Sequence, residues 1–199
     1  MWEMTRSKTM SSVLVRAGKH FSLVMRHKAV VARLCFRAGI PWRGIMHDWS
    51  KFSPTEFVEG VKYFDGSYSP IRNRKKEVGY SDAQLHHIGR NKHHYEYWYD
   101  YSSPVAAPPM PYKYLVEMVC DGLAAGLVYE GKKWTKDYQI KFWKKKMERD
   151  EKYIHPTTVV FATAVFEEVA EKGVDAVITR ENMRAVYEKY VGSVLRKAA

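Results

Sequence analysis

A histidine–aspartate pair followed by a lysine is the first feature of the sequence that could do chemistry. The segment HDWSKFSPTEF, residues 47–57, places His47 next to Asp48 and sets Lys51 three residues after the aspartate. Imidazole and carboxylate together suit divalent transition metals, and a lysine binds phosphate oxygens. Adjacent residues on a helix point about 100° apart, so a lone pair usually serves two separate ends. The interpretation therefore depends on partners elsewhere in the chain.

Seven of the eight histidines precede residue 95 and could supply those partners. His20 and His27 are seven residues apart and share a helix face, between an apolar face and a basic stripe that contains Arg26 and Arg33. His27 is the better candidate ligand because it lies deeper along the helix. We expect His20 at the surface or on a rim.

Two histidine doublets follow, His86–His87 and His93–His94. If one helix continues through both, one histidine of each doublet shares a face, but the intervening GRNK can instead bend the chain. The sequence leaves open which histidine of each doublet is a ligand.

Asp121 stands in the middle of the apolar segment LVEMVCDGLAAGLV. A buried carboxylate without a partner is costly, so a cation must face it, and a metal ion is the economical candidate. Helical bundles commonly build such sites from facing helices. Asp48 has two oxygens and could bridge two ions.

Such a site points to phosphate chemistry. A water molecule held by the metal becomes acidic enough to attack phosphorus, and nearby cations hold the phosphate oxygens. We predict Lys51, Arg26 and Arg33 as phosphate-binding residues. Asp48 and Lys51 are predicted to be catalytic, and Glu56 is a candidate for proton transfer on its position.

The order of these residues resembles the HD-domain superfamily of metal-dependent phosphohydrolases, which carries the signature H…HD…D on a helical bundle. HDWSK is similar to the H-D-x-G-K form of that superfamily, with Ser50 in the glycine position. Three blocks, HDWSKFSPTEF, HHIGRNKHHYEYW and MVCDG, more closely resemble an uncharacterised bacterial and phage family, over about residues 20–130.

The resemblance implies a set of metal ligands. The primary ligands would be His27, His47, Asp48 and Asp121, and a second metal would take His87, His93 or His94. The implied cofactor is one or two divalent ions, with Mn, Fe, Zn, Ni, Co and Mg all left open.

Composition favours a partner that carries phosphate. Lysine and arginine number 33 against 22 aspartate and glutamate residues, giving a formal net charge of +11. Residues 1–51 contain ten of the basic residues and two acidic ones. This balance suits a nucleotide or a nucleic acid. The two cysteines, Cys35 and Cys120, lie in apolar patterns and are expected in the core.

Apolar residues recur at three- and four-residue spacing, which predicts an all-α helical bundle. We expect one domain over 1–199, with an HD-like metal-site core over 11–130 and C-terminal helices over 131–199. The helices are predicted at about 11–38, from 41, from 54 after a Ser53 cap, at 82–98 after a Ser81 cap, and at 112–130, 135–152, 157–172 and 180–195. Residues 65–80 and 101–111 are predicted as loops.

The expected function is hydrolysis of a nucleotide or other small phosphate ester by a metal-activated water. The alternative is a non-catalytic basic helical protein that binds nucleic acid and contains a structural metal or polar cluster. We expect a cytoplasmic protein without a membrane span, because charged residues interrupt every long apolar stretch. Substrate and oligomeric state stay open.

Overall fold

Helices make up all the regular secondary structure that a computed structural model of the chain describes, at residues 2–66, 69–102 and 107–198. Those residues contain no strand, so the predicted all-α class is confirmed. Within the same residues, no helix combines the length and the apolar character needed to cross a bilayer.

The chain divides into two compact units. The first unit contains residues 1–28 and 48–91, and the second contains residues 29–47 and 92–199. The chain therefore passes between units within its first helix, at the peptide bond between His47 and Asp48, and after Asn91. The predicted division into 11–130 and 131–199 stays a prediction.

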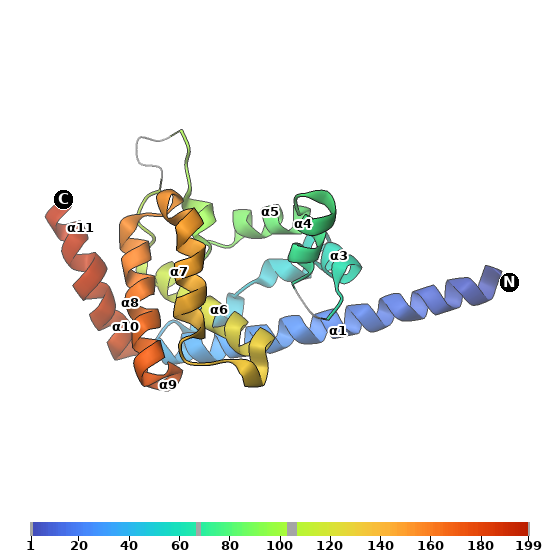
Figure 1. Ribbon diagram of the computed structural model, residues 1–199, viewed down its shortest axis with the longest axis horizontal. Coiled ribbons are helices and arrows are strands. Elements are labelled where there is room, and N and C mark those ends of the chain that lie inside the picture. The colour runs from blue at the N-terminus through green and yellow to red at the C-terminus, as the bar shows by residue number, and fades with distance from the viewer. Residues whose placement is uncertain (1, 67–68, 103–106, 199) are drawn as a thin grey trace. The chain divides into compact units, whose positions relative to one another are not determined.

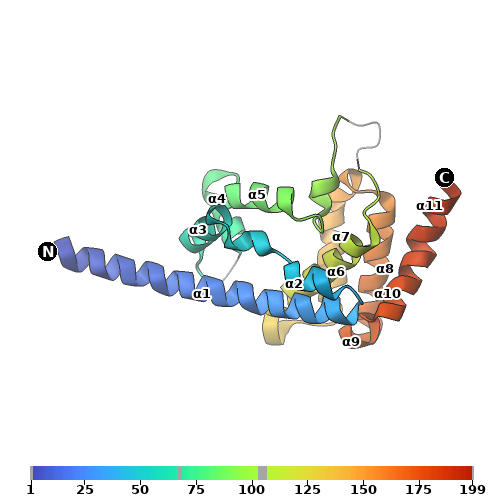
Figure 2. The same cartoon turned by 180° about the vertical axis from the view of Figure 1, so that it is seen from behind.

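The first unit is built around a short helix, α3 (Pro54–Tyr63), that packs against α4 (Pro70–Val78) and α5 (Asp82–Arg90) (Figure 1). The same three helices lie together when the molecule is seen from behind (Figure 2). This unit also contains α1 (Trp2–Arg37) as far as Lys28, and the 3₁₀ turn η1 (Trp49–Phe52). The helix α1 starts earlier than the predicted residue 11.

Two predicted helix starts in this unit are confirmed. The side chain of Ser53 accepts a hydrogen bond from the backbone N–H of Glu56, and that of Ser81 accepts one from Gln84. Each serine thereby satisfies one of the backbone donors that the first turn of a helix leaves unpaired.

The predicted loop at 65–80 is wrong over most of its length, because α4 occupies residues 70–78. Pro70 takes the first helical position, and Gly79 ends the helix at a φ of 88°. Proline at the start and a left-handed glycine after the end are ordinary helix signals, and the polar composition of the segment concealed them. Residues 67–68 of this loop, and 103–106 of the predicted connection at 101–111, lie outside the described residues.

The predicted helix at 82–98 is also wrong in its second half. The helix α5 ends at Arg90, and a separate 3₁₀ turn, η2 (Tyr95–Trp98), follows. The backbone of Asn91 is extended, with φ −115° and ψ 99°, and this ends the helix. The backbone oxygen of His87 accepts hydrogen bonds from both the backbone N–H of Asn91 at 3.1 Å and its side-chain amide at 2.8 Å. The two histidine doublets therefore do not share one helix.

The second unit contains the apolar core. Its central helix α6 (Tyr112–Glu130) ends before Gly131 as predicted, and α8 (Pro156–Lys172) packs against α6, α7 and α10 (Figure 1). The remaining elements are the end of α1, α2 (Pro41–Met46), η2, η3 (Gly131–Lys133), α7 (Tyr138–Asp150), η4 (Glu151–Tyr153), α9 (Val174–Val177), α10 (Arg180–Tyr187), the π-helical turn η5 (Glu188–Gly192) and α11 (Ser193–Ala198).

Large side chains from three of these helices are fully buried in the core. Leu115 and Leu123 of α6, Phe161 of α8 and Met183 of α10 are all fully buried. Cys35 and Cys120 are buried and free, so their predicted place in the core is confirmed. This packing holds α6, the helix that carries Asp121, within the core of the second unit.

Candidate metal centre

Three predicted ligands converge in the second unit: His47 at the end of α2, His93 in the turn after α5, and Asp121 on α6. The Nε2 atom of His47 lies 3.5 Å from Oδ1 of Asp121, and Nε2 of His93 lies 3.6 Å from Oδ2. One donor atom from each residue lies within 4.8 Å of the other two. The histidine side chains are 0% and 1% exposed, and that of Asp121 is 21% exposed. The cluster is therefore buried but reachable from its carboxylate side.

Glu117 lies behind the two histidines. Its Oε1 atom is 3.1 Å from Nδ1 of His47 and 3.2 Å from Nδ1 of His93. The other carboxylate oxygen accepts a hydrogen bond from Nε of Arg43 at 2.6 Å. With Nδ1 of His47 donating to Glu117, the Nε2 lone pair of that imidazole faces Asp121.

The charge of Glu117 is maintained by these contacts. Burial alone would raise the pKa of this carboxyl, but its contacts with His47, His93 and Arg43 outweigh burial and lower the pKa to about 2. Glu117 is therefore a carboxylate at neutral pH, as suits an acceptor from His47 and Arg43.

The donor set fits a divalent transition metal. Two ligand atoms about 2.1 Å from one ion, at the tetrahedral angle, stand about 3.4 Å apart. The His47–Asp121 and His93–Asp121 separations of 3.5 and 3.6 Å are close to that value. A carboxylate that orients the far nitrogen of a metal-binding histidine is a usual outer partner in metal sites. These buried His and Asp side chains could hold a metal ion.

The first unit has a polar cluster of its own around Asp48. The Oδ1 atom of Asp48 lies 3.3 Å from Nε2 of His87, and Oδ2 lies 3.2 Å from Nζ of Lys51. A ring nitrogen of His27 lies within 4.8 Å of a carboxylate oxygen of Asp48. Asp48 has a φ of 51°, a left-handed conformation that aspartate tolerates better than most residues.

Glu56 supports the imidazoles of this second cluster. Its two oxygens lie 2.7 Å from Nδ1 of His86 and 2.7 Å from Nδ1 of His87. Burial would raise the pKa of Glu56, but the hydrogen bonds from His87 and His86 outweigh it and lower the pKa. Because both of its oxygens are engaged by histidines, Glu56 is placed to orient His87, and its predicted role in proton transfer stays a prediction.

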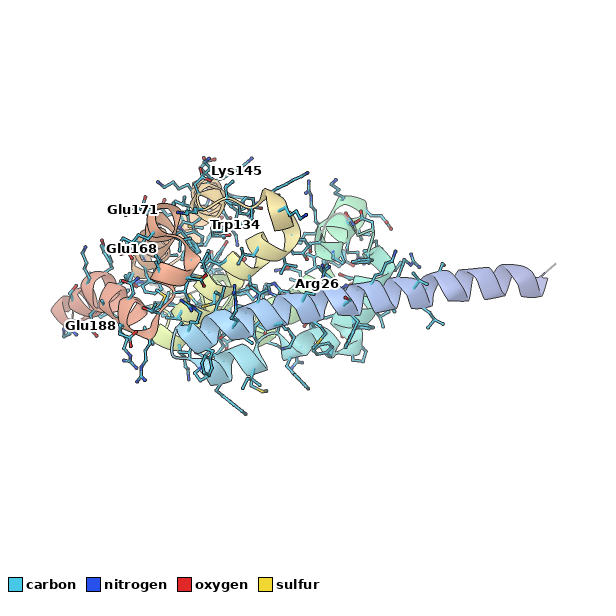
Figure 3. The ribbon with its side chains drawn as sticks, turned by 90° about the horizontal axis from the view of Figure 1, so that it is seen from below. Arg26, Trp134, Lys145, Glu168, Glu171 and Glu188 are labelled. Carbon is cyan, nitrogen blue, oxygen red and sulfur yellow. The ribbon has the colours of Figure 1, made fainter. Side chains whose placement is uncertain are left out.

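The remaining predicted residues are His94, Arg26 and Arg33. The ring of His94 packs against that of His93 at a tilt of 41°, with centroids 4.3 Å apart, and its Nδ1 lies 3.8 Å from a carboxylate oxygen of Glu96. Arg26, labelled in Figure 3, is exposed on the part of α1 that belongs to the first unit. Arg33 is exposed on the part that belongs to the second.

The expectation that His20 lies at the surface is wrong. The side chain is buried against Phe57 and Phe64, with ring centroids 5.5 and 5.8 Å away, and against Gly60. Because residue 60 is glycine, it has no side chain to exclude the imidazole from this position. The helical periodicity of α1 alone could not reveal this contact with another helix.

The family model described as "Family of unknown function (DUF5662)" matches residues 16–168. The chain belongs to this family. The DUF5662 match contains every residue of both clusters. It also contains the whole of α6 and α7, and α8 as far as Glu168. No curated protein and no solved structure matches the chain. The predicted resemblance to an uncharacterised family is thereby confirmed.

Sequence reasoning missed several polar residues that support the two clusters of this DUF5662 protein. Glu117 is one helical turn before Asp121, so the argument that a buried carboxylate needs a cationic partner applied to it equally. Arg43 had the positive charge that a buried carboxylate needs, and it lies in the short helix α2 that ends directly before His47. The Glu56–His86 pair had no signal in sequence spacing.

Proposed function

We propose that this protein is a metal-dependent phosphohydrolase that acts on a nucleotide or another small phosphate ester. The convergence of His47, His93 and Asp121 within one unit, with Glu117 behind both imidazoles, carries the proposal. The resemblance of the H…HD…D order to the HD-domain superfamily supports it, as does the net charge of +11. We place the reaction in the cytoplasm.

His47, His93 and Asp121 would hold the ion. When bound, a divalent ion supplies Lewis-acid chemistry, because it acidifies a water molecule and offsets the negative charge of a phosphoryl group. Glu117 would accept the Nδ1 proton of His47, so that Nε2 of that imidazole is the atom presented to the ion, and its charge lies 3.2 Å from Nδ1 of His93. Arg43 donates a hydrogen bond to the other carboxylate oxygen, Oε2, of Glu117 and so helps to position it.

The first unit contributes Asp48 and Lys51 to the proposal. Lys51 carries an ammonium group suited to phosphate oxygens, and its side chain is 24% exposed, so that its charge is available to solvent. Asp48 fixes Lys51 at 3.2 Å, and His87 contacts the other oxygen of Asp48. Asp48 is proposed to bind or orient the reacting group and Lys51 to bind phosphate.

Phosphate release from nucleoside monophosphates and from bis(p-nitrophenyl) phosphate tests the proposal. Purified protein is treated with chelator, reloaded with Mn²⁺, Zn²⁺, Ni²⁺ or Co²⁺, and compared with the variants His47→Ala and Asp121→Asn. We expect activity that needs the metal and falls at least 100-fold in both variants. Asp175→Asn, on an exposed carboxylate in the same unit, is the control and should keep full activity. Absence of release with every metal would end the proposal.

A groove in the first unit favours a second function, nucleic-acid binding. The groove has a volume of about 470 Å³ and is lined by Arg16, Lys19, Arg26 and Asp65 among others. From Arg16 to Arg26 the helix rises about 15 Å. This length exceeds the width of a single phosphate group and is comparable to the distance spanned by several successive phosphates of a nucleic-acid strand.

Salt dependence separates this second function from the first. Affinity for a single-stranded oligonucleotide should fall steeply as salt rises, and the slope should become shallower in Arg16→Gln and Arg26→Gln. If the protein is a nucleic-acid binder without catalysis, binding should persist in His47→Ala. Weak, salt-independent binding would exclude this function.

A further inference from the structure

Several tyrosines with exposed rings follow the candidate ligand His93 along the chain. Tyr97 is 37% exposed, Tyr99 is 41% exposed and Tyr101 is 85% exposed. Tyr97 belongs to the turn η2, and the other two tyrosines come shortly after it, within the second unit. Exposed aromatic rings that gather in one segment are typical of an interaction site rather than of a core.

Ring contacts connect this segment to two neighbouring elements of the same unit. Tyr99 packs edge-on against Tyr153 of η4, with ring centroids 5.1 Å apart. Tyr97 packs edge-on against Trp98 at 5.4 Å, and Trp98 packs against Tyr114 of α6 at 5.8 Å. These side chains form one surface, which we call the aromatic surface: Tyr97, Trp98, Tyr99, Tyr114 and Tyr153.

Exposed lysines lie over three rings of the aromatic surface. The Nζ atom of each lysine is between 4.9 and 5.4 Å from the centroid of its ring. An ammonium group at this distance is attracted to the face of the ring. The pairs are Lys92 with Tyr97, Lys113 with Tyr114, and Lys152 with Tyr153. Cations and aromatic rings therefore alternate on this surface.

Two carboxylates in the same segment contact groups other than these three lysines. A carboxylate oxygen of Glu96, within η2, is 3.7 Å from Nζ of Lys146. The Oδ1 atom of Asp100 accepts hydrogen bonds from the backbone N–H and the hydroxyl of Ser102. The positive charge of the lysines over the rings is therefore available to an anionic partner.

A single-stranded nucleic acid fits the aromatic surface best. Its bases stack on exposed aromatic rings, and lysines close to those rings meet its phosphates. In a duplex the faces of the bases are stacked on one another, so they are not open to a tyrosine. A protein partner fits less well, because lysine is depleted from the buried centre of protein–protein interfaces. A membrane surface would need a continuous apolar face, whereas each exposed ring of this surface carries a hydroxyl group.

We propose that the aromatic surface binds a single-stranded nucleic acid, with bases stacked on Tyr97 and Tyr99 and phosphates held by Lys92 and Lys152. On binding, the flexible lysine stems leave the ring faces to the bases and bring the ammonium groups to the phosphates. This inference needs neither a metal ion nor catalysis. It goes beyond the groove of the first unit, because it adds contacts with bases to contacts with phosphates.

Oligonucleotides with and without bases test the stacking directly. The full-length protein, in the presence of a chelator, is titrated into a labelled oligodeoxythymidine of about 16 nucleotides and followed by fluorescence anisotropy. An abasic strand of the same length keeps the phosphates and lacks the bases. We expect the abasic strand to bind about tenfold more weakly. Equal affinity for the two strands would overturn the inference, because phosphate contacts alone would then account for binding.

Tyrosine variants locate the surface that stacks on the bases. Tyr97→Leu and Tyr99→Leu keep an apolar side chain and lose the ring, so each should weaken the oligodeoxythymidine about tenfold and leave the abasic strand unchanged. Tyr129→Leu, at an exposed position of α6 outside the aromatic surface, is the matched control and should bind as the wild type does. Tyr101→Leu, at the most exposed of these positions, replaces either variant that does not fold. Unchanged affinity in the folded variants would overturn the inference.

The same titrations distinguish failure of this inference from failure of the proposed functions. Weaker binding in Arg16→Gln and Arg26→Gln, with no effect of Tyr97→Leu or Tyr99→Leu, would assign the strand to the groove of the first unit and remove the aromatic surface. The opposite pattern would remove the groove and support the inference. Binding that depends on the tyrosines, without phosphate release from any ester, would likewise support the inference while ending the phosphohydrolase proposal.

Discussion

The Oε1 atom of Glu117 lies 3.1 Å from Nδ1 of His47, and both side chains are fully buried. A buried carboxylate at this position favours the imidazole tautomer with its proton on Nδ1, so that the Nε2 lone pair faces Asp121. The candidate metal centre thus depends on Glu117, a residue of α6 that was not among the predicted ligands.

Replacing Glu117 by glutamine should weaken metal binding. The variant keeps the shape of the side chain but loses the charge that fixes the two imidazoles, so we expect metal affinity to fall about 10- to 100-fold. Competition with a coloured chelator measures the affinity. Glu171→Gln, at an exposed position of α8 (Figure 3), is the control and should bind metal as the wild type does. Unchanged affinity in Glu117→Gln would show that the carboxylate has no such role.

Removing Arg43 should destabilise the metal-free protein. Its guanidinium is the charged partner of Glu117 at 2.6 Å, and its loss leaves a fully buried carboxylate without that cation. We expect Arg43→Met to lower the free energy of unfolding by about 3 kcal/mol. Arg37→Met breaks an exposed pair with Asp175 and should cost less than about 1 kcal/mol. Equal losses in urea denaturation would contradict this interpretation.

Glycine at position 60 should be required by His20. A Cβ atom on residue 60 would stand 2.4 Å from Nε2 of that histidine, so Gly60→Ala must displace a buried ring and should cost about 1–3 kcal/mol. Gly18→Ala is the matched change on α1, where no atom lies within 4 Å of the new Cβ, and it should stabilise by about 0.5–1 kcal/mol. Thermal unfolding of both variants decides the comparison, and similar effects would refute the packing argument.

His20 should also make stability depend on pH. Burial, followed by the charge of Lys51, lowers the pKa of His20 from 6.5 to about 4. The unfolded chain therefore binds this proton at a higher pH than the folded protein, and stability is complete above pH 6.5 and is lost as pH falls toward 4.

We expect the wild type to lose about 2 kcal/mol more than His20→Leu between pH 7 and pH 4.5. Urea denaturation at the two pH values measures the difference. Parallel losses in the two proteins would mean that His20 titrates normally in the fold.

Local signals in the sequence predicted most helix boundaries. The caps at Ser53 and Ser81 depend on residues three positions apart, and both form the hydrogen bonds expected of them. The missed helix α4 had equivalent local signals in Pro70 and Gly79, hidden by a run of charged residues.

The convergence of the site could be predicted only in part. The ligand order named His47 and Asp121 as primary ligands, together with His27 and Asp48, which belong to the first unit. It left open which of His87, His93 and His94 is a ligand. The contributions of Glu117 and Gly60 depend on contacts between segments far apart in the chain, which spacing does not contain. The end of α5 at Arg90 coincides with the extended backbone of Asn91, whose side chain and N–H both bind the carbonyl of His87.

A cobalt(II) titration followed by visible absorption tests the central claim most directly, because His47, His93 and Asp121 are proposed to bind a divalent ion. We predict that the wild type develops a d–d absorption band as one site fills, and that His93→Ala and Asp121→Asn lose that band and one bound ion. The same number of ions, bound with the same affinity and the same band in all three proteins, would contradict the account.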